Sequence, residues 1–201
     1  MRRRDVGVPG WGVVSSVAAP VLLIGGWTLA ARRQHGGFDP VVDTISALAA
    51  RDADDRWVMT TALAGLGVCH LVTALALRPA RLPGRLVLGV GGVATVLVAA
   101  FPLPSGGGSS QAHSTVAGIA FLCLGLWPLA SWRVSAPGLL RRAPALAAGV
   151  VLLGLVGWFF AELTSDSARV GLAERVAAGA QALWPLAVVA SVIALARRAR
   201  R

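Results

Sequence analysis

A few titratable and hydroxyl side chains lie beside the long apolar stretches of this 201-residue chain. A histidine and several carboxylates at one level of a protein have the chemistry to hold a divalent cation or to transfer protons. We predict a binding site formed by Asp39, Asp43, Ser46, His113, Ser114, Glu162 and Asp166. The catalytic candidates in this set are Asp43, Ser46, His113 and Glu162, and the candidate ligands of a divalent cation are Asp43, His113 and Glu162.

The carboxylates also have a structural interpretation. Glu162, Asp166 and Glu174 lie near the ends of apolar stretches, close to Arg169 and Arg175. Acidic side chains stabilise helix N-termini, and they pair with neighbouring arginines. The sequence leaves both interpretations open.

His70 lies deep inside an apolar stretch, in the segment GVCHLVTA. An ionisable group at such a depth is a candidate for proton transfer or ligand contact. The alternative is a neutral histidine that is hydrogen-bonded to a threonine hydroxyl or a carbonyl of a neighbouring helix. No second histidine or acid lies at the same depth in another stretch, so the pattern does not favour a haem pair or a proton wire.

The sequence lacks the short motifs of common enzyme classes. It has no G-x-S-x-G, H-E-x-x-H, P-loop or dinucleotide-binding pattern. A Ser/His/Asp arrangement can be assembled from Ser46, His113 and Asp166, but many chains with serine-bearing loops allow one. We expect no nucleotide or haem cofactor, and a divalent cation is the cofactor that stays a candidate.

The elements that position these residues are predicted to be membrane-spanning helices. Hydrophobic residues make up 56% of the chain and charged residues 14%, and the mean hydropathy is +0.70. Stretches of about 20 continuously apolar residues suit helices that cross a bilayer, whereas barrel strands would alternate. We predict an all-α, single-domain membrane bundle over residues 1–201, with six spans at residues 11–31, 57–77, 86–103, 113–132, 143–163 and 176–196.

The arginines predict the orientation of the bundle. All 19 basic residues are Arg, and most lie before the first span, after the last span and in the second and fourth loops. Because cytoplasmic loops are rich in basic residues, we expect a multi-pass protein of the cell membrane with both termini in the cytoplasm. The net charge of +10 does not indicate nucleic-acid binding, since the arginines cluster at the ends of apolar runs rather than along one face.

The first outer loop begins with DPVVDTISAL, from Asp39 to Leu48. Asp39 as N-cap and Pro40 in the first turn predict a short helix. Its apolar residues are spaced as on one helix face, which is typical of a helix at the membrane boundary. Asp43 and Ser46 share a neighbouring face that we expect to point into the mouth of the bundle. The later segment RDADDRW is predicted to be a solvated connector.

Several segments together resemble the DUF998 family of bacterial six-span membrane proteins. They are FDPVVDTISAL (38–48), RW (56–57), FP (101–102), AHSTVAGIAFL (112–122) and GLAER (171–175), and D-P-V-x-D-T-I-S-x-L is the most specific. Members of the family often continue ISDLG where this chain has Ala47, so position 47 is a poor catalytic candidate here. The resemblance implies a membrane helical bundle of unknown function.

Three functions fit the pattern. The favoured one is a non-enzymatic protein that binds a membrane lipid, or a membrane-protein partner, at an outward-facing mouth. The first alternative is an outer-leaflet, metal-assisted hydrolase or transferase that acts on a lipid-linked substrate. The second is a small-solute or proton-coupled transporter that depends on His70, although the spans show no evident inverted repeat.

Overall fold

The structure is a computed structural model that describes residues 7–108, 110–134, 136, 138–165 and 167–199. Among these residues all regular elements are helices, and each of the six α-helices is long and apolar enough to cross a membrane. The prediction of an all-α protein with six such helices is confirmed. The elements are α1 (Gly10–Arg32), η1 (Ser46–Ala49), α2 (Trp57–Ala76), α3 (Leu82–Ala100), α4 (Gln111–Ser131), η2 (Gly138–Leu140), α5 (Arg142–Thr164) and α6 (Val170–Arg198), of which η1 and η2 are short 3₁₀ helices.

The largest differences from the predicted starts are in α3 and α6, which begin at Leu82 rather than at residue 86 and at Val170 rather than at residue 176. Helix α3 begins early because Pro83 lies at a helix-starting position. Helix α6 has 29 residues, which exceeds the roughly 20 that a bilayer requires. Its extra first turns contain Glu174 and Arg175, the polar residues at which the apolar run stops.

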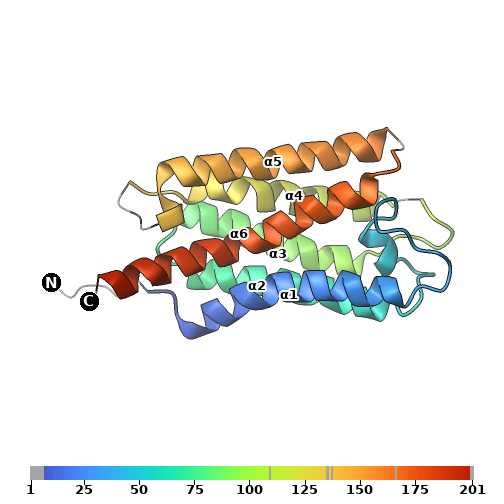
Figure 1. The fold of residues 1–201 in the computed structure, drawn as a ribbon, viewed down its shortest axis with the longest axis horizontal. Coiled ribbons are helices and arrows are strands. Elements are labelled where there is room, and N and C mark those ends of the chain that lie inside the picture. Colours follow the sequence, from blue (N-terminus) through green and yellow to red (C-terminus); the bar gives the residue numbers. More distant parts are fainter. Residues whose placement is uncertain (1–6, 109, 135, 137, 166, 200–201) are drawn as a thin grey trace.

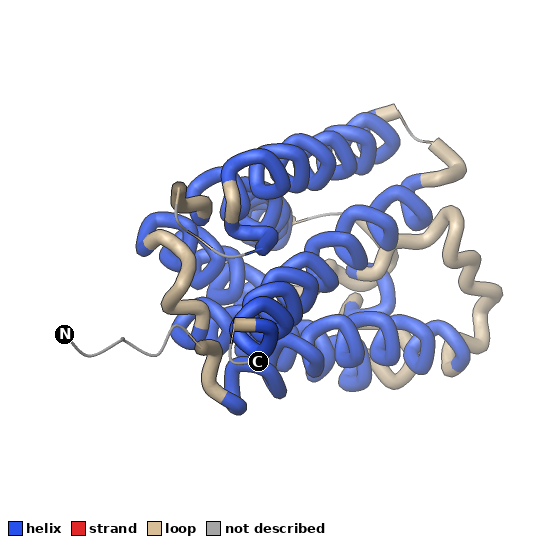
Figure 2. Tube along the Cα trace, turned by 60° about the vertical axis from the view of Figure 1, so that its left-hand side comes forward, coloured by secondary structure: helices blue, strands red, loops and turns tan. Residues whose placement is uncertain are grey.

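The helices form a ring of neighbours around the bundle axis. Each α-helix packs against the next in the chain, and α1 also packs against α6. Figure 1 shows α6 crossing diagonally between the α1–α2 pair and the α4–α5 pair, and Figure 2 shows the helices and their connecting loops from another side. We call the end where α1 begins and α6 ends the terminal end, and the opposite end, where the α1–α2, α3–α4 and α5–α6 connections lie, the mouth end (Figure 1).

Close helix contacts and an apolar outer surface fit this bundle to a lipid environment. Gly67 of α2 and Gly92 of α3 lie so close that a Cβ atom on Gly67 would meet the Gly92 carbonyl oxygen at 2.5 Å. Small residues allow such approaches in membrane bundles. Large apolar side chains such as Val14, Leu75 and Val150 are exposed, as lipid-facing positions are.

The segment from Asp39 to Leu48 is not the continuous helix that the sequence predicts. It forms a turn, in which the N–H groups of Val42 and Asp43 donate to the Asp39 carbonyl, followed by the 3₁₀ helix η1. An α-helix would pair the Ile45 N–H with the Val41 carbonyl. Helix α6 takes both groups instead, because the Leu172 N–H donates to the Val41 carbonyl at 2.9 Å and the Glu174 carboxylate accepts from the Ile45 N–H.

The apolar residues of this segment do not share one face. Val41 and Val42 are each 41% exposed, whereas Ile45 and Leu48 are buried in the core of the bundle. The predicted interfacial helix is therefore replaced by a plug whose second half inserts between the helices at the mouth end.

Candidate functional site at the mouth end

Ser46, at the start of η1, lies between two titratable side chains that come from different helices. Its Oγ is 3.2 Å from Nε2 of His113 on α4 and 3.5 Å from Oε1 of Glu174 on α6. The second contact is long for a hydrogen bond between oxygens and is the weaker of the two. These three residues, which we call the mouth triad, join three segments that are far apart in the sequence.

His113 is fixed in this position by both its backbone and its ring. The Ser110 hydroxyl accepts from the His113 N–H at 3.1 Å and caps the start of α4. The ring Nδ1 lies 2.8 Å from the carbonyl oxygen of Phe101. Because a carbonyl oxygen only accepts, Nδ1 carries a proton and donates it, and Nε2 is the atom that faces Ser46.

Glu174 is almost completely buried, with 4% of its surface exposed. Its carboxylate accepts from the Ile45 N–H and contacts the Ser46 hydroxyl. The next residue, Arg175, donates from Nη1 to the carbonyl oxygens of Pro40 at 2.8 Å and Asp43 at 2.7 Å. Helix α6 thus anchors the plug through two consecutive charged residues.

The mouth triad has the connectivity to share one proton. With an ionised Glu174, the Ser46 hydroxyl donates to the carboxylate and a protonated His113 donates to Ser46. With a neutral His113, the Ser46 hydroxyl donates to Nε2 and a protonated Glu174 donates to Ser46. Both arrangements hold the same number of protons, and in both every N–H and O–H group between the two residues donates a hydrogen bond. The hydrogen-bonded row His113–Ser46–Glu174 is therefore suited to move a proton between its two ends.

A cavity of about 60 Å³ lies beneath the mouth triad. It runs between α1, α2, α3, α4 and α6, and its wall is mostly Leu, Ala, Val and Phe side chains. Ser46 and Glu174 belong to its wall on the mouth side, and His70, Thr95 and Gln181 are the other polar residues of the wall. We call this space the mouth cavity.

The structure does not bring Asp39 and Asp43 into the mouth triad. The Asp39 carboxylate accepts from the Val41 N–H at 2.8 Å, and the Asp43 carboxylate accepts from the Asp39 N–H at 2.8 Å. Both carboxylates thus stabilise the turn of the plug. Asp43 reaches α6 only through its backbone carbonyl, which accepts from Arg175. Ser114, beside His113, is exposed.

Glu162 pairs with a neighbouring arginine, as the structural interpretation of the carboxylates expects. Its Oε1 accepts from the Trp158 indole N–H at 2.8 Å and lies 3.2 Å from Nη2 of Arg169. Asp166 lies outside the described residues. The described part of the chain holds no group of three or more His, Cys, Asp and Glu side chains placed to bind a metal ion. In the described part of the chain, Asp43, His113 and Glu162, the predicted ligands of a divalent cation, are engaged in separate contacts.

Glu174 is the member of the triad that the sequence did not assign to the site. Its position next to Arg175, just before an apolar run, is typical of an exposed helix-end pair. Its burial depends on Gly171 one turn earlier, where a Cβ atom would clash with the carbonyl oxygen of Asp43. A single glycine in the sequence does not reveal that a loop packs on it.

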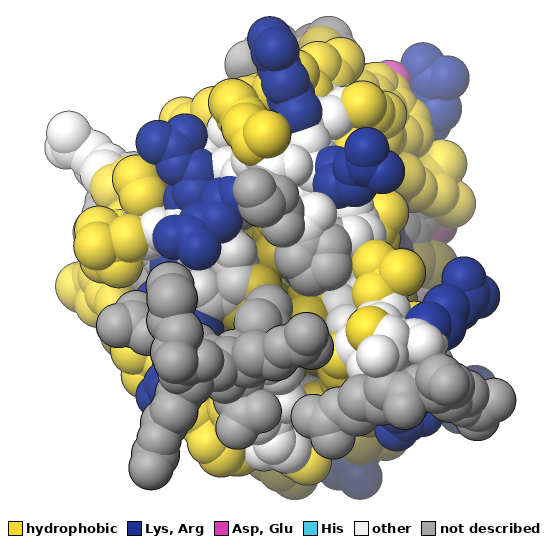
Figure 3. Space-filling model, turned by 90° about the vertical axis from the view of Figure 1, so that its left-hand side faces the viewer, with side chains coloured by type: hydrophobic (Ala, Val, Ile, Leu, Met, Phe, Trp, Pro, Cys, Tyr) yellow, Lys and Arg dark blue, Asp and Glu magenta, His cyan; other side chains and the backbone are white. Residues whose placement is uncertain are grey.

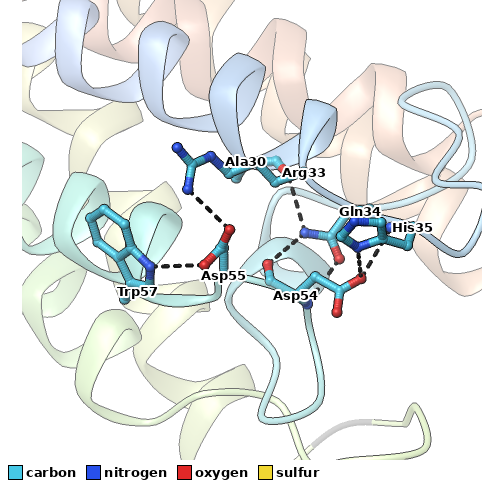
Figure 4. Close-up of polar contacts among 7 residues, drawn as sticks. All are labelled: Ala30, Arg33, Gln34, His35, Asp54, Asp55 and Trp57. Carbon is cyan, nitrogen blue, oxygen red and sulfur yellow. Dashed lines mark hydrogen bonds and ion pairs between the residues drawn. The ribbon is translucent and has the colours of Figure 1, made fainter.

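The two ends of the loop between α1 and α2 are joined by a polar clasp (Figure 4). The Asp54 carboxylate accepts from the His35 N–H at 3.0 Å, and the Gln34 amide exchanges two hydrogen bonds with the backbone of Asp54. Asp55 pairs with Arg33 at 3.0 Å. The connector RDADDRW is thus tied to the end of α1 through Asp54 and Asp55.

These contacts lower the pKa values of both aspartates. The His35 backbone N–H is the main cause for Asp54, and the Arg33 side chain is the main cause for Asp55; the pKa of each lies below its ordinary value of 3.8. Hydrogen bonds and a positive charge favour the ionised carboxylate.

The fold and these contacts define a multi-pass α-helical membrane protein with a buried polar triad over an internal cavity. The chain belongs to the DUF998 family, a family of proteins of unknown function, whose model matches residues 17–191. No curated protein and no solved structure matches the chain.

Proposed function

We propose that the protein binds a small, lipid-derived amphipathic molecule at its mouth end. The polar end of the ligand contacts the mouth triad, and its apolar part enters the mouth cavity. The observation that carries the proposal is an apolar cavity of about 60 Å³ whose wall includes Ser46 and Glu174. An apolar pocket with a few convergent polar groups is the typical form of a small-molecule site.

A lipid-derived ligand suits this site better than a protein partner does. His113 and Glu174 are only 7% and 4% exposed. A protein that docks on the mouth end would not reach them, whereas a slender molecule that enters between helices would. Membrane lipids surround the bundle, so such a ligand has a short path to the cavity.

We propose the cell membrane as the location, with both termini in the cytoplasm and the mouth end outside. Figure 3 shows arginine side chains around the terminal end. All described acidic residues lie at the mouth end, in the α1–α2 loop and near the adjoining ends of α5 and α6. By the positive-inside rule, this distribution supports a cytoplasmic terminal end. The described arginines of that end are Arg78, Arg81, Arg85, Arg133, Arg141, Arg142, Arg197 and Arg198.

Native mass spectrometry of the protein released from detergent micelles tests ligand binding. We expect the wild type to retain an adduct with the mass of a small amphipathic molecule, and Ala117→Leu to lose it because residue 117 lines the mouth cavity. Ala161→Leu is the matched control, since Ala161 is exposed on α5. The proposal fails if the wild type carries no adduct, or if Ala117→Leu retains the same one.

A second candidate is an enzyme that acts on a lipid-linked substrate with Ser46 as the nucleophile. The 3.2 Å contact between Ser46 Oγ and His113 Nε2 favours it, because a histidine in that place activates a serine hydroxyl. Labelling by a fluorophosphonate probe that Ser46→Ala abolishes would support the enzyme. Absence of labelling together with a retained adduct would support the binding protein.

A further inference from the structure

His70 is a fully buried histidine with no hydrogen-bond partner in the described part of the chain. Its side chain lies on α2 with 0% of its surface exposed, and neither Nδ1 nor Nε2 has a partner. A neutral imidazole offers one N–H donor and one acceptor nitrogen. Leaving both unpaired in an apolar interior is costly, so this position calls for a partner that is not part of the protein.

The mouth cavity is the space in which such a partner would lie. His70 is part of its wall together with Leu124 and Gln181. His70 follows Trp57, the first residue of α2, by 13 positions, which places it about 20 Å from the mouth end at 1.5 Å per residue. Leu124 and Gln181 lie at comparable positions along α4 and α6. His70 therefore marks the inner end of a cavity whose outer end is the mouth triad.

Thr95 and Gln181, the other neutral polar side chains of the cavity wall, have partners within the protein. The Thr95 hydroxyl donates to the Gly91 carbonyl at 2.8 Å, and the Gln181 amide donates to the Phe121 carbonyl at 2.8 Å. Among the lining residues the charged group is Glu174, at the outer end. A charged ligand atom at the inner end would be desolvated without compensation, whereas a hydroxyl or carbonyl would pair with His70.

From this geometry we infer that His70 is a second recognition point of the mouth cavity, and that the ligand is a molecule whose inner, apolar end carries an uncharged hydroxyl or carbonyl group. The inference rests on the proposed function, because it assigns the chemistry of the same ligand. It narrows the ligand from amphipathic lipids in general to molecules with polar groups at both ends of a short apolar segment.

Photolabelling in vesicles of phosphatidylcholine and phosphatidylglycerol tests the inference. The reporter is octan-1-ol with a diazirine in the chain, and labelled peptides are identified by mass spectrometry. The competitors are unlabelled octane-1,8-diol, with two polar ends, and octan-1-ol, with one. In the wild type both competitors reduce labelling of cavity residues. The ratio of their half-inhibitory concentrations measures the contribution of the second polar group, and comparing variants cancels differences in membrane partitioning.

Replacing His70 is expected to change this ratio selectively. In His70→Leu the half-inhibitory concentration of the diol should rise about five- to tenfold relative to that of octan-1-ol, which is the effect of one lost hydrogen bond. His70→Gln keeps a donor and an acceptor and should retain most of the diol preference, which guards against a folding defect in the leucine variant. Thr95→Val is the matched control, because it removes a cavity hydroxyl that already has a partner, and it should leave the ratio unchanged.

The outcomes separate the two proposals. If cavity residues are not labelled in the wild type, the proposed function is wrong and the inference falls with it. If they are labelled but the ratio is the same in the wild type and His70→Leu, ligand binding stands and the role of His70 is wrong. An equal shift in Thr95→Val would also overturn the inference, because it would reflect general polarity of the cavity.

Discussion

Ser46 is the residue on which the polar chain of the mouth end depends. Its Oγ is the hydrogen-bond partner that His113 and Glu174 share among the described residues, at 3.2 Å from Nε2 and 3.5 Å from Oε1. Without the hydroxyl, Nε2 and the carboxylate oxygen have no shared neighbour, and both residues stay buried. The two segments that carry these residues are separated by about 60 positions, so one side chain connects α4 to α6 through the plug.

Ser46→Ala is therefore expected to destabilise the protein. Leaving buried polar groups unpaired lowers the free energy of unfolding by about 1–3 kcal/mol. The measurement is denaturant unfolding in detergent micelles, followed by circular dichroism. Ser114→Ala is the control, since Ser114 is exposed and should change little. Equal stability of both variants would show that the mouth triad contributes no net stabilisation.

At the same scale, the aspartates of the clasp predict a response to acid. Their folded-state pKa values lie below the ordinary value of 3.8. Their contribution to stability is therefore fully present above the unfolded pKa and is lost as the pH falls below about 4 and through the folded pKa. Hydrogen exchange at the His35 amide, corrected for its intrinsic rate, should accelerate in that window. An Asp54→Asn, Asp55→Asn variant should lack this step, and an identical step in that variant would contradict the prediction.

At the scale of elements, the contact between the plug and α6 depends on Gly171. The Leu172 N–H donates to the Val41 carbonyl at 2.9 Å, and the Arg175 guanidinium binds two carbonyl groups of the plug. This packing leaves no room for a side chain at position 171, where a Cβ atom would meet the Asp43 carbonyl. The plug is thus held by the backbone of α6 as much as by its side chains.

Gly171→Ala should push the plug away from α6 and separate Ser46 from Glu174. We expect a loss of stability of about 1–3 kcal/mol, as for other overpacked sites, and faster hydrogen exchange over residues 39–49. Gly157→Ala on α5 is the matched control, because a Cβ atom there has no neighbour within 4 Å and alanine favours helix. Unchanged exchange in Gly171→Ala would show that the plug is held by other contacts.

The same elements show what the sequence predicts and what it does not. The spans follow from hydropathy alone, because lipid requires long apolar helices, and the outcome agrees. The common level of Ser46 and His113 is readable from the sequence, whereas their contact at 3.2 Å is seen only in the structure. The helix predicted at Asp39–Leu48 is absent from the structure, because α6 pairs with the Val41 carbonyl and the Ile45 N–H. Local propensity carries no information about that contact, and the burial of Glu174 depends on the same packing.

For the whole molecule, an even number of crossings places the start of α1 and the end of α6 at one end (Figure 1). Aromatic and arginine side chains mark both ends of the bundle. At the terminal end, the guanidinium carbons of Arg81 and Arg142 lie 5.8 and 5.7 Å from the ring centroid of Trp132. At the mouth end, the guanidinium carbon of Arg33 lies 6.0 Å from the ring centroid of Trp57. Tryptophans near basic groups are typical of the two membrane interfaces.

The proposed orientation predicts which end reacts with an impermeant reagent on intact cells. In a background in which Cys69 and Cys123 are replaced by alanine, Gly36→Cys at the mouth end should react with a charged maleimide without permeabilisation. Position 36 is exposed and tolerates a side chain, since a Cβ atom there has no neighbour within 4 Å. Arg78→Cys, exposed at the terminal end, should react only after permeabilisation. The reverse pattern would place the mouth triad in the cytoplasm, and a ligand would then have to enter from the inner leaflet.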